Sequence, residues 1–66
     1  MKNTIKVERA KLDMTQAQLA EKIQVSRQTI NAMEANKYVP STVLALKMSR
    51  LFGKTVNEIF ELEATD

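Results

Sequence analysis

Four hydroxyl side chains divide this chain into short segments, and each precedes apolar residues at helical spacing: Thr15, Ser26, Ser41 and Thr55. Serine and threonine are favoured as helix N-caps because the side-chain oxygen accepts a hydrogen bond from a free backbone N–H. A capping box also needs Gln or Glu three residues later, and Gln18 and Glu58 stand at those places. The sequence therefore predicts helices over about residues 15–23, 26–35, 41–52 and 55–60.

Two residues with restricted or permissive backbones mark where helices end. Pro40 disfavours the helical conformation at Val39, so residues 36–40 are expected to form a loop. Gly53 follows the apolar residues of the fourth helix and is expected to end it. With one glycine, one proline and few aromatic residues, the chain is expected to be a compact all-α domain of five helices.

The two ends of the chain are the least regular. A first helix is expected over about residues 3–12, with Ile5 and Leu12 facing inward and Val7 on another face. Residues 61–66 form an acidic tail or an edge strand, because Phe60 to Glu63 alternate between apolar and charged residues. A short two-stranded β ribbon between the chain termini is therefore the alternative to a free tail.

The chain has to be stable without covalent or metal cross-links. It has no cysteine and no histidine among 66 residues, so disulfides and the commonest metal ligands are excluded. Helix packing or a partner subunit must supply the stability. With no Gly-rich phosphate loop and no paired carboxylates, no catalytic site, metal or cofactor is expected. A ligand pocket of about 300–1,000 Å³ is more than so small a core can spare.

The net charge of +2 conceals an asymmetry between the body and the tail. Residues 1–54 hold all ten basic residues and four acidic ones, a net charge of +6, whereas residues 55–66 carry −4. This distribution suits a polyanionic partner, although a solvated surface is an equally simple reading. No apolar run approaches the roughly 20 residues of a membrane span, so a soluble, cytoplasmic protein is expected.

The stretch from Thr15 to Lys37 predicts two helices joined by a tight turn, as in helix-turn-helix proteins, whose second helix enters the major groove. At about 100° per residue, Ile30 and Met33 fall on one face of that second helix. Arg27, Gln28 and Asn31 share the opposite face, with small alanines beside them.

The side chains on that opposite face are those that read base edges. Arginine pairs with guanine, and glutamine or asparagine pairs with adenine. An ordinary solvated helix face carries Glu and Lys more often than this set. Gln16, at the start of the preceding helix, and Lys37 and Tyr38, after the second helix, are candidates for phosphate contacts. For Lys37 the alternative is an ordinary solvated surface lysine without a role in binding.

The sequence resembles the Cro/CI-type (XRE) helix-turn-helix family over nearly its whole length. The resemblance rests on TQAQLAEK at 15–22, VSRQTIN at 25–31 and NKYVPS at 36–41. It continues through LALK at 44–47 and LFG at 51–53 to IF at 59–60. Within the family, the chain looks most like short stand-alone regulators of the cytolysin-repressor type. The resemblance implies a lambda-repressor-like fold with a DNA-binding domain over residues 1–60 and its helix-turn-helix unit at about 15–35.

The same resemblance implies a role for each matching residue. Gln16 would bind a phosphate at the start of the second helix, and Lys37 and Tyr38 would contact the DNA backbone. The base-contacting positions of the recognition helix would be Ser26, Arg27, Gln28 and Asn31. Arg9 and Glu34 would form a structural ion pair.

The sequence departs from the family pattern at three positions. Gln24 and Asn36 stand where glycine is usual, so each is expected to have a positive φ at a cost of roughly 1 kcal/mol. Glu8 stands where leucine is common, so the first helix is expected to pack less fully. None of the three lies on the face formed by Arg27, Gln28 and Asn31, which we call the reading face.

A homodimer is expected because one recognition helix reads too few base pairs, and family members bind two-fold operators. The candidate interface residues are Val39, Val56, Ile59 and Phe60. The alternative is that all four residues belong to the core of the single chain. For Ile59 and Phe60, a core role is expected as much as an interface role.

The sequence thus predicts a homodimeric regulator of transcription, a repressor by default, that binds double-stranded DNA. The competing hypothesis is a protein-interaction subunit, such as an antitoxin-like partner, using the acidic tail and the apolar last helix. Antitoxins usually carry a long disordered extension, and only six residues follow Phe60 here.

Overall fold

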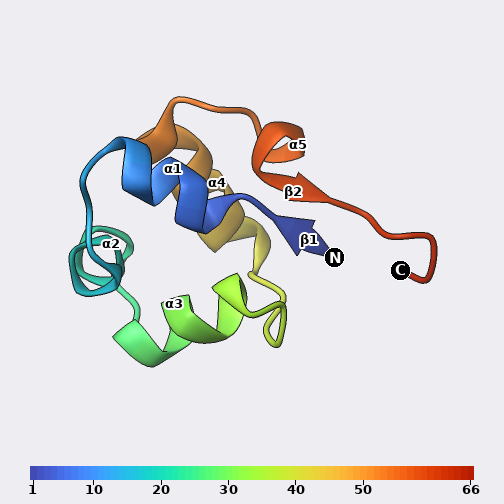
Figure 1. Cartoon of the computed structure of the whole chain (residues 1–66), viewed down its shortest axis with the longest axis horizontal. Coiled ribbons are helices and arrows are strands. Elements are labelled where there is room, and N and C mark those ends of the chain that lie inside the picture. Colours follow the sequence, from blue (N-terminus) through green and yellow to red (C-terminus); the bar gives the residue numbers. More distant parts are fainter.

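A computed structural model describes all 66 residues, with five helices between two short strands. The helices are α1 (Ile5–Lys11), α2 (Gln16–Ile23), α3 (Arg27–Glu34), α4 (Thr42–Phe52) and α5 (Val56–Ile59). The strands β1 (Lys2–Asn3) and β2 (Phe60–Glu61) pair antiparallel, with Lys2 opposite Glu61 and Asn3 opposite Phe60. In Figure 1, α2 and α3 lie on one side of α1, and both chain ends project beyond the helices. The all-α prediction and the β ribbon are confirmed.

The predicted N-caps start four of the helices. The hydroxyls of Thr15, Ser26, Ser41 and Thr55 each accept a hydrogen bond from the backbone N–H three residues later. Both capping boxes are complete, since Gln18 and Glu58 return a side-chain oxygen to the N–H of their cap residue. These short helices therefore begin where local hydrogen bonds satisfy their free amides.

Four helices are followed within two residues by a residue in the left-handed conformation, with φ of 56° at Asp13, 62° at Gln24, 61° at Asn36 and 66° at Gly53. In each case the next residue's N–H bonds back to a carbonyl five positions earlier, as in a Schellman motif. The positive φ expected at Gln24 and Asn36 is confirmed. Asp13 has the same conformation, which the sequence analysis did not anticipate.

Nine apolar residues form one core, eight of them from the five helices and the ninth, Phe60, from β2. They are Ile5, Leu19, Ala20, Ile23, Ile30, Met33, Met48, Ile59 and Phe60. Burial of Ile5 and exposure of Val7 agree with the predicted faces of α1. The inward position predicted for Leu12 is wrong, because α1 ends at Lys11 and the turn toward Asp13 leaves Leu12 half exposed.

Glu8 lies buried on α1, with only 8% of its surface exposed. Its carboxylate pairs with Lys11 Nζ at 3.4 Å, one helical turn away. A leucine at this position would bring no charge into the protein. The buried carboxylate does, and the ammonium of Lys11 compensates that charge.

The two chain ends are also joined by charge. The α-amino group of Met1 pairs with the carboxylates of Glu63 at 3.1 Å and Asp66 at 3.0 Å. Hydrogen bonding to Asp66, and then to Glu63, raises the pKa of this amine above its ordinary 8.0. The backbone N–H of Glu63, and then the amine, lower the pKa of Asp66. The residues after β2 are thus held against the N-terminus.

No helix in this structure combines the length and the apolar character that a membrane span requires.

Candidate nucleic-acid interface

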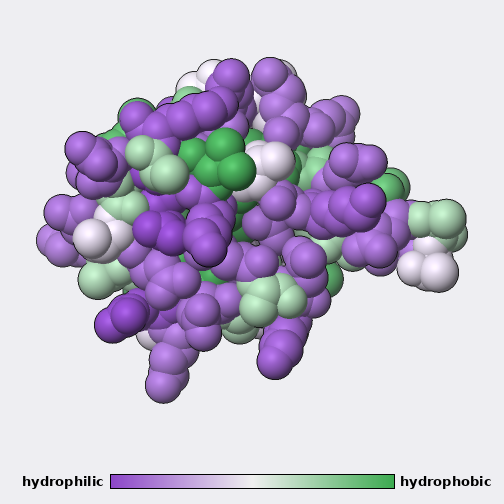
Figure 2. Space-filling model, in the orientation of Figure 1, coloured by the Kyte–Doolittle hydropathy of each residue, from purple (hydrophilic) through white to green (hydrophobic).

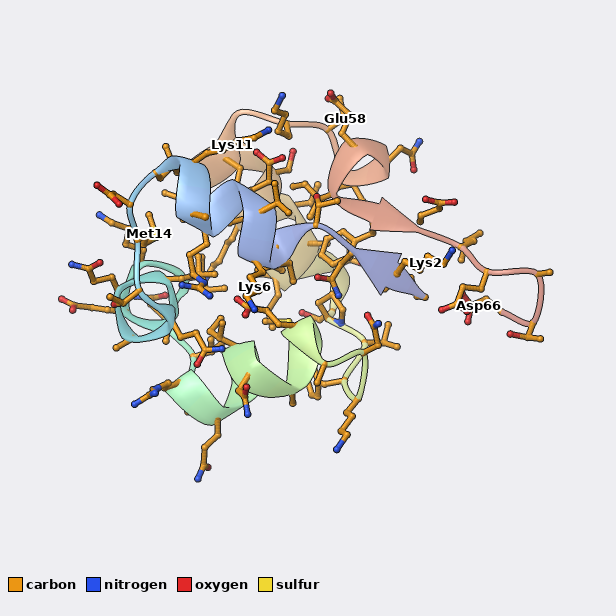
Figure 3. The ribbon with its side chains drawn as sticks, viewed as in Figure 1. Lys2, Lys6, Lys11, Met14, Glu58 and Asp66 are labelled. Carbon is orange, nitrogen blue, oxygen red and sulfur yellow. The ribbon has the colours of Figure 1, made fainter.

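The second helix of the predicted pair, α3, packs against the rest of the protein on one side only. Ile30 and Met33 are buried in the core, whereas Arg27, Gln28 and Asn31 are exposed. Side chains project from the side of α3 that faces away from the other helices (Figure 3). In Figure 2 this part of the surface is mostly hydrophilic. The helical faces expected from the residue spacing are therefore present.

A shallow hollow lies between the start of α2 and the exposed face of α3. It is lined only by polar side chains, those of Gln16, Arg27, Gln28 and Asn31. Four of the expected DNA-contacting residues are thus brought together, although Gln16 lies eleven or more residues from the others. The hollow offers hydrogen-bond donors and acceptors on one open surface.

The turn between the two helices positions the start of α3. Gln24 follows α2 in the left-handed conformation, and the N–H of Val25 donates a hydrogen bond to the carbonyl of Ala20 at 2.9 Å. Ser26 then begins α3, and its Oγ accepts the N–H of Thr29 at 3.1 Å. The hydroxyl of Ser26, expected to contact a base, therefore already serves as the helix cap.

Gln16 reaches across from α2 to α3. Its Nε2 group donates to Glu34 Oε1 at 3.1 Å and to Asn31 Oδ1 at 3.4 Å. Because one amide nitrogen carries only two hydrogens, both are engaged. A phosphate contact from this side chain would require it to give up one of these bonds. Gln18 N–H is bonded to the Thr15 cap, but the N–H groups of Gln16 and Ala17 remain available as donors at the positive end of α2.

Arg9 and Glu34 form the ion pair expected from the family pattern. Arg9 Nε lies 2.9 Å from Glu34 Oε2, and its Nη2 donates to Oε1 at 3.3 Å. A third donor, Nη1, bonds to the carbonyl oxygen of Met14 at 2.8 Å. Only 16% of the Arg9 side chain and 9% of the Glu34 side chain are exposed. The pair therefore connects α1 to the end of α3 in a partly desolvated setting.

The same end of α3 is also held by a residue that the sequence analysis missed. Asn3 Nδ2, in β1, donates to the carbonyl of Met33 at 2.8 Å and to Asn36 Oδ1 at 2.9 Å. No local pattern could have indicated this contact, because thirty or more residues separate the partners along the chain. Beyond it, Lys37 and Tyr38 are both exposed in the loop after α3.

The four candidate interface residues differ in their exposure. Val39 is 71% exposed and Val56 is half-buried, whereas Ile59 and Phe60 are buried in the core. Val39, Val56 and Phe60 nevertheless border one apolar hollow, together with Leu46 of α4. The core role left open for Ile59 and Phe60 is thus the one they have in the single chain.

Comparison with known proteins now decides the family. The model of the helix-turn-helix family matches residues 5–59, which include all five helices. The chain belongs to the helix-turn-helix family. As a member of this family, of the Cro/CI (XRE) type, it is a DNA-binding regulator and not an enzyme.

Relatives of this helix-turn-helix protein occur in archaea and bacteria. An HTH-type transcriptional regulator of Methanocaldococcus jannaschii is 49% identical over 63 residues, which make up 96% of each chain. One of Bacillus subtilis is 43% identical over 63 residues, again 96% of each chain. One of Archaeoglobus fulgidus is 45% identical over 60 residues, 91% of this chain and 84% of the relative.

Proposed function

We propose that this helix-turn-helix protein is a transcriptional repressor that binds an inverted-repeat operator as a homodimer, with α3 in the major groove. The observation that carries the proposal is the exposed polar face of α3, where Arg27, Gln28 and Asn31 adjoin Gln16. B-DNA presents a distinct donor and acceptor pattern for each base pair in that groove. A helix with these side chains has the chemistry to read it.

Each polar residue has a role in this proposal that follows from its place. Arg27 and Gln28, in the first turn of α3, contact base edges, with guanine and adenine as their respective preferred partners. Lys37 and Tyr38, exposed after α3, contact phosphates and fix the register of the protein on the duplex. The first turn of α2 accommodates a second phosphate at its positive end.

Homodimerisation supplies the second half-site. The apolar hollow bordered by Val39, Leu46 and Val56 lies outside the polar face of α3, so a second copy can cover it without blocking the DNA contacts. The chain measures 32 × 23 × 20 Å along its principal axes. Two copies side by side can therefore carry their α3 helices about 34 Å apart, one turn of B-DNA.

Repression follows from occupancy alone. A dimer that spans two half-sites covers more than one helical turn of the duplex and excludes other proteins from it. No further activity of the protein is required for this effect.

The decisive experiment is selection of bound duplexes from a random pool at two salt concentrations. We expect an enriched inverted repeat whose half-site centres are about one helical turn apart. Binding that enriches no sequence and disappears with added salt would overturn the proposal, because it would reflect phosphate contacts alone. The protein-interaction hypothesis would then take first place, and co-purification of a partner from native cells would test it.

A further inference from the structure

Four polar side chains from three helices form one continuous chain of hydrogen bonds that ends on the reading face. Arg9 of α1 donates to Glu34, at the end of α3. Glu34 Oε1 also accepts from Gln16 Nε2 of α2 at 3.1 Å. The same nitrogen donates to Asn31 Oδ1 at 3.4 Å. This series of hydrogen bonds therefore runs from a partly buried ion pair to Asn31, an exposed side chain beside Arg27 and Gln28.

The charge of Glu34 determines the direction of every bond in this chain. An ionised carboxylate only accepts hydrogen bonds, so Gln16 must turn its NH₂ group, and not its oxygen, toward Glu34. That NH₂ group only donates, so Asn31 must in turn direct its oxygen toward Gln16. The orientation of both amides thus follows from hydrogen-bond chemistry, although oxygen and nitrogen are similar in size.

The donor end of Asn31 is left free. Its Nδ2 group has no hydrogen-bond partner within the protein, whereas Oδ1 faces the Gln16 side of the hollow. A side chain held in this way approaches a base with two hydrogens rather than with an adjacent donor and acceptor. Guanine and thymine present acceptors in the major groove, cytosine presents a donor, and adenine presents one of each.

We propose that the Arg9–Glu34 ion pair, acting through Gln16, fixes Asn31 as a hydrogen-bond donor toward the major groove and so selects guanine or thymine at its base pair. Gln16 is then a positioning residue for base recognition, which is a different role from binding a phosphate. This inference rests on the proposed function, because it assumes that α3 lies in the groove.

The test compares the sequences selected from a random duplex pool by the wild type and three variants. Asn31→Ala identifies the base pair that Asn31 reads, as the position where the preference disappears. The wild type is expected to prefer guanine or thymine there. Gln16→Ala leaves the ion pair intact but frees the amide of Asn31, so this preference should fall roughly tenfold while preferences elsewhere persist.

Glu34→Gln gives the sharper result, because it keeps the shape of the side chain and changes its chemistry. Its new amide keeps an oxygen for the shorter bond, from Arg9 Nε, and places its nitrogen where Oε1 stood, giving up the 3.3 Å bond from Nη2. That nitrogen faces Gln16, which must then present an oxygen. Asn31 is thereby reversed and offers an acceptor, so the preference should move toward cytosine or adenine. Glu21→Gln, exposed on α2, makes the same change of charge and should leave the preference unaltered.

The outcomes separate this inference from the proposed function. A wild type that prefers adenine or cytosine at the Asn31 position overturns the inference. So does an unchanged preference in Gln16→Ala, or an Asn31→Ala variant that selects the wild-type sequence. If the wild type enriches no sequence at all, the proposed function itself has failed. Should Glu34→Gln fail to fold, Gln16→Ala still decides, because it leaves both charged residues and the hydrogen bonds between them in place.

Discussion

The guanidinium of Arg9 and the carboxylate of Glu34 meet through two hydrogen bonds, Nε to Oε2 at 2.9 Å and Nη2 to Oε1 at 3.3 Å. This two-point contact is stronger and more directional than a single bond between the same charges. It joins α1 to the last residue of α3, so it fixes the recognition helix at the end opposite its N-cap. The pair has both a structural role and a place beside the reading face.

Replacing Arg9 by methionine should lower the free energy of unfolding by about 3 kcal/mol, because it leaves the carboxylate of Glu34 partly buried without its counter-ion. The carbonyl of Met14 loses a donor at the same time. Urea denaturation followed by circular dichroism measures the change.

The double variant Arg9→Met with Glu34→Leu provides the matched control. With both charges removed, the desolvation penalty disappears, and stability should recover part of the loss seen in Arg9→Met alone. A double variant that is less stable by the sum of the single losses would contradict this account, because it would show that the two residues act independently.

The left-handed residues that end the helices give opposite expectations for glycine substitution. Gln24→Gly relieves a side chain that is costly at φ 62°, and should raise the free energy of unfolding by about 0.5 kcal/mol. Asn36→Gly should instead lower it by about 0.5 kcal/mol, because asparagine tolerates this conformation and Asn36 Oδ1 accepts from Asn3. Thermal unfolding of the two variants in parallel makes the comparison. Equal effects at both sites would contradict it.

The parts of the fold that depend on neighbouring residues could be predicted from the sequence. The N-caps, both capping boxes and the exposed face of α3 each follow from residues within one or two helical turns. The inward position of Leu12 was wrong because helical spacing alone does not show that α1 ends at Lys11. The left-handed conformation of Asp13 was missed because no glycine or family pattern indicated it.

The parts that depend on distant residues could not be predicted from spacing. Asn3 contacts Met33 and Asn36 only because β1 lies beside the end of α3. The bonds from Gln16 to Glu34 and Asn31 likewise arise from the packing of α2 on α3. Only the Arg9–Glu34 pair was anticipated across such a separation, and it came from the family pattern rather than from the residues themselves.

Arg27 and Lys37 should contribute differently to DNA binding. Arg27→Ala is expected to cost about 1–3 kcal/mol on the selected operator and to relax preference at one base pair. Lys37→Ala should weaken binding to all sequences alike and reduce the slope of log K against log salt by about one. Titrations of operator and unrelated duplexes at several salt concentrations separate the two effects. Identical behaviour of the variants would contradict the division between base and phosphate contacts.

The apolar hollow beside Val39 should be covered in a dimer. Val39→Asp places a charge on a side chain that is 71% exposed in the single chain, so the fold should survive while self-association weakens. Val7→Asp is the control, because Val7 is 53% exposed on α1 and does not border the hollow. Sedimentation equilibrium should show a monomer for Val39→Asp and a dimer for Val7→Asp and the wild type. An unaffected dimer in Val39→Asp would place the interface elsewhere.

The capping box of α5 should make stability depend on pH in the acidic range. Glu58 Oε1 accepts the N–H of Thr55 at 2.9 Å, and this bond, followed by the bond with the Thr55 hydroxyl, lowers the pKa of Glu58 below its ordinary 4.5. The unfolded chain therefore binds the proton more tightly than the folded one. The stabilising contribution is complete above pH 4.5 and is lost as the pH falls through the lower, folded-state value.

Glu58→Gln isolates this effect, because glutamine keeps an accepting oxygen but does not titrate. The free energy of unfolding of the wild type should exceed that of Glu58→Gln near neutral pH, and the difference should shrink as the pH falls below 4.5. Asp66, whose pKa is also lowered, is present in both proteins and cancels in the difference. A difference that stays constant over this range would show that α5 depends on the geometry of the cap and not on its charge.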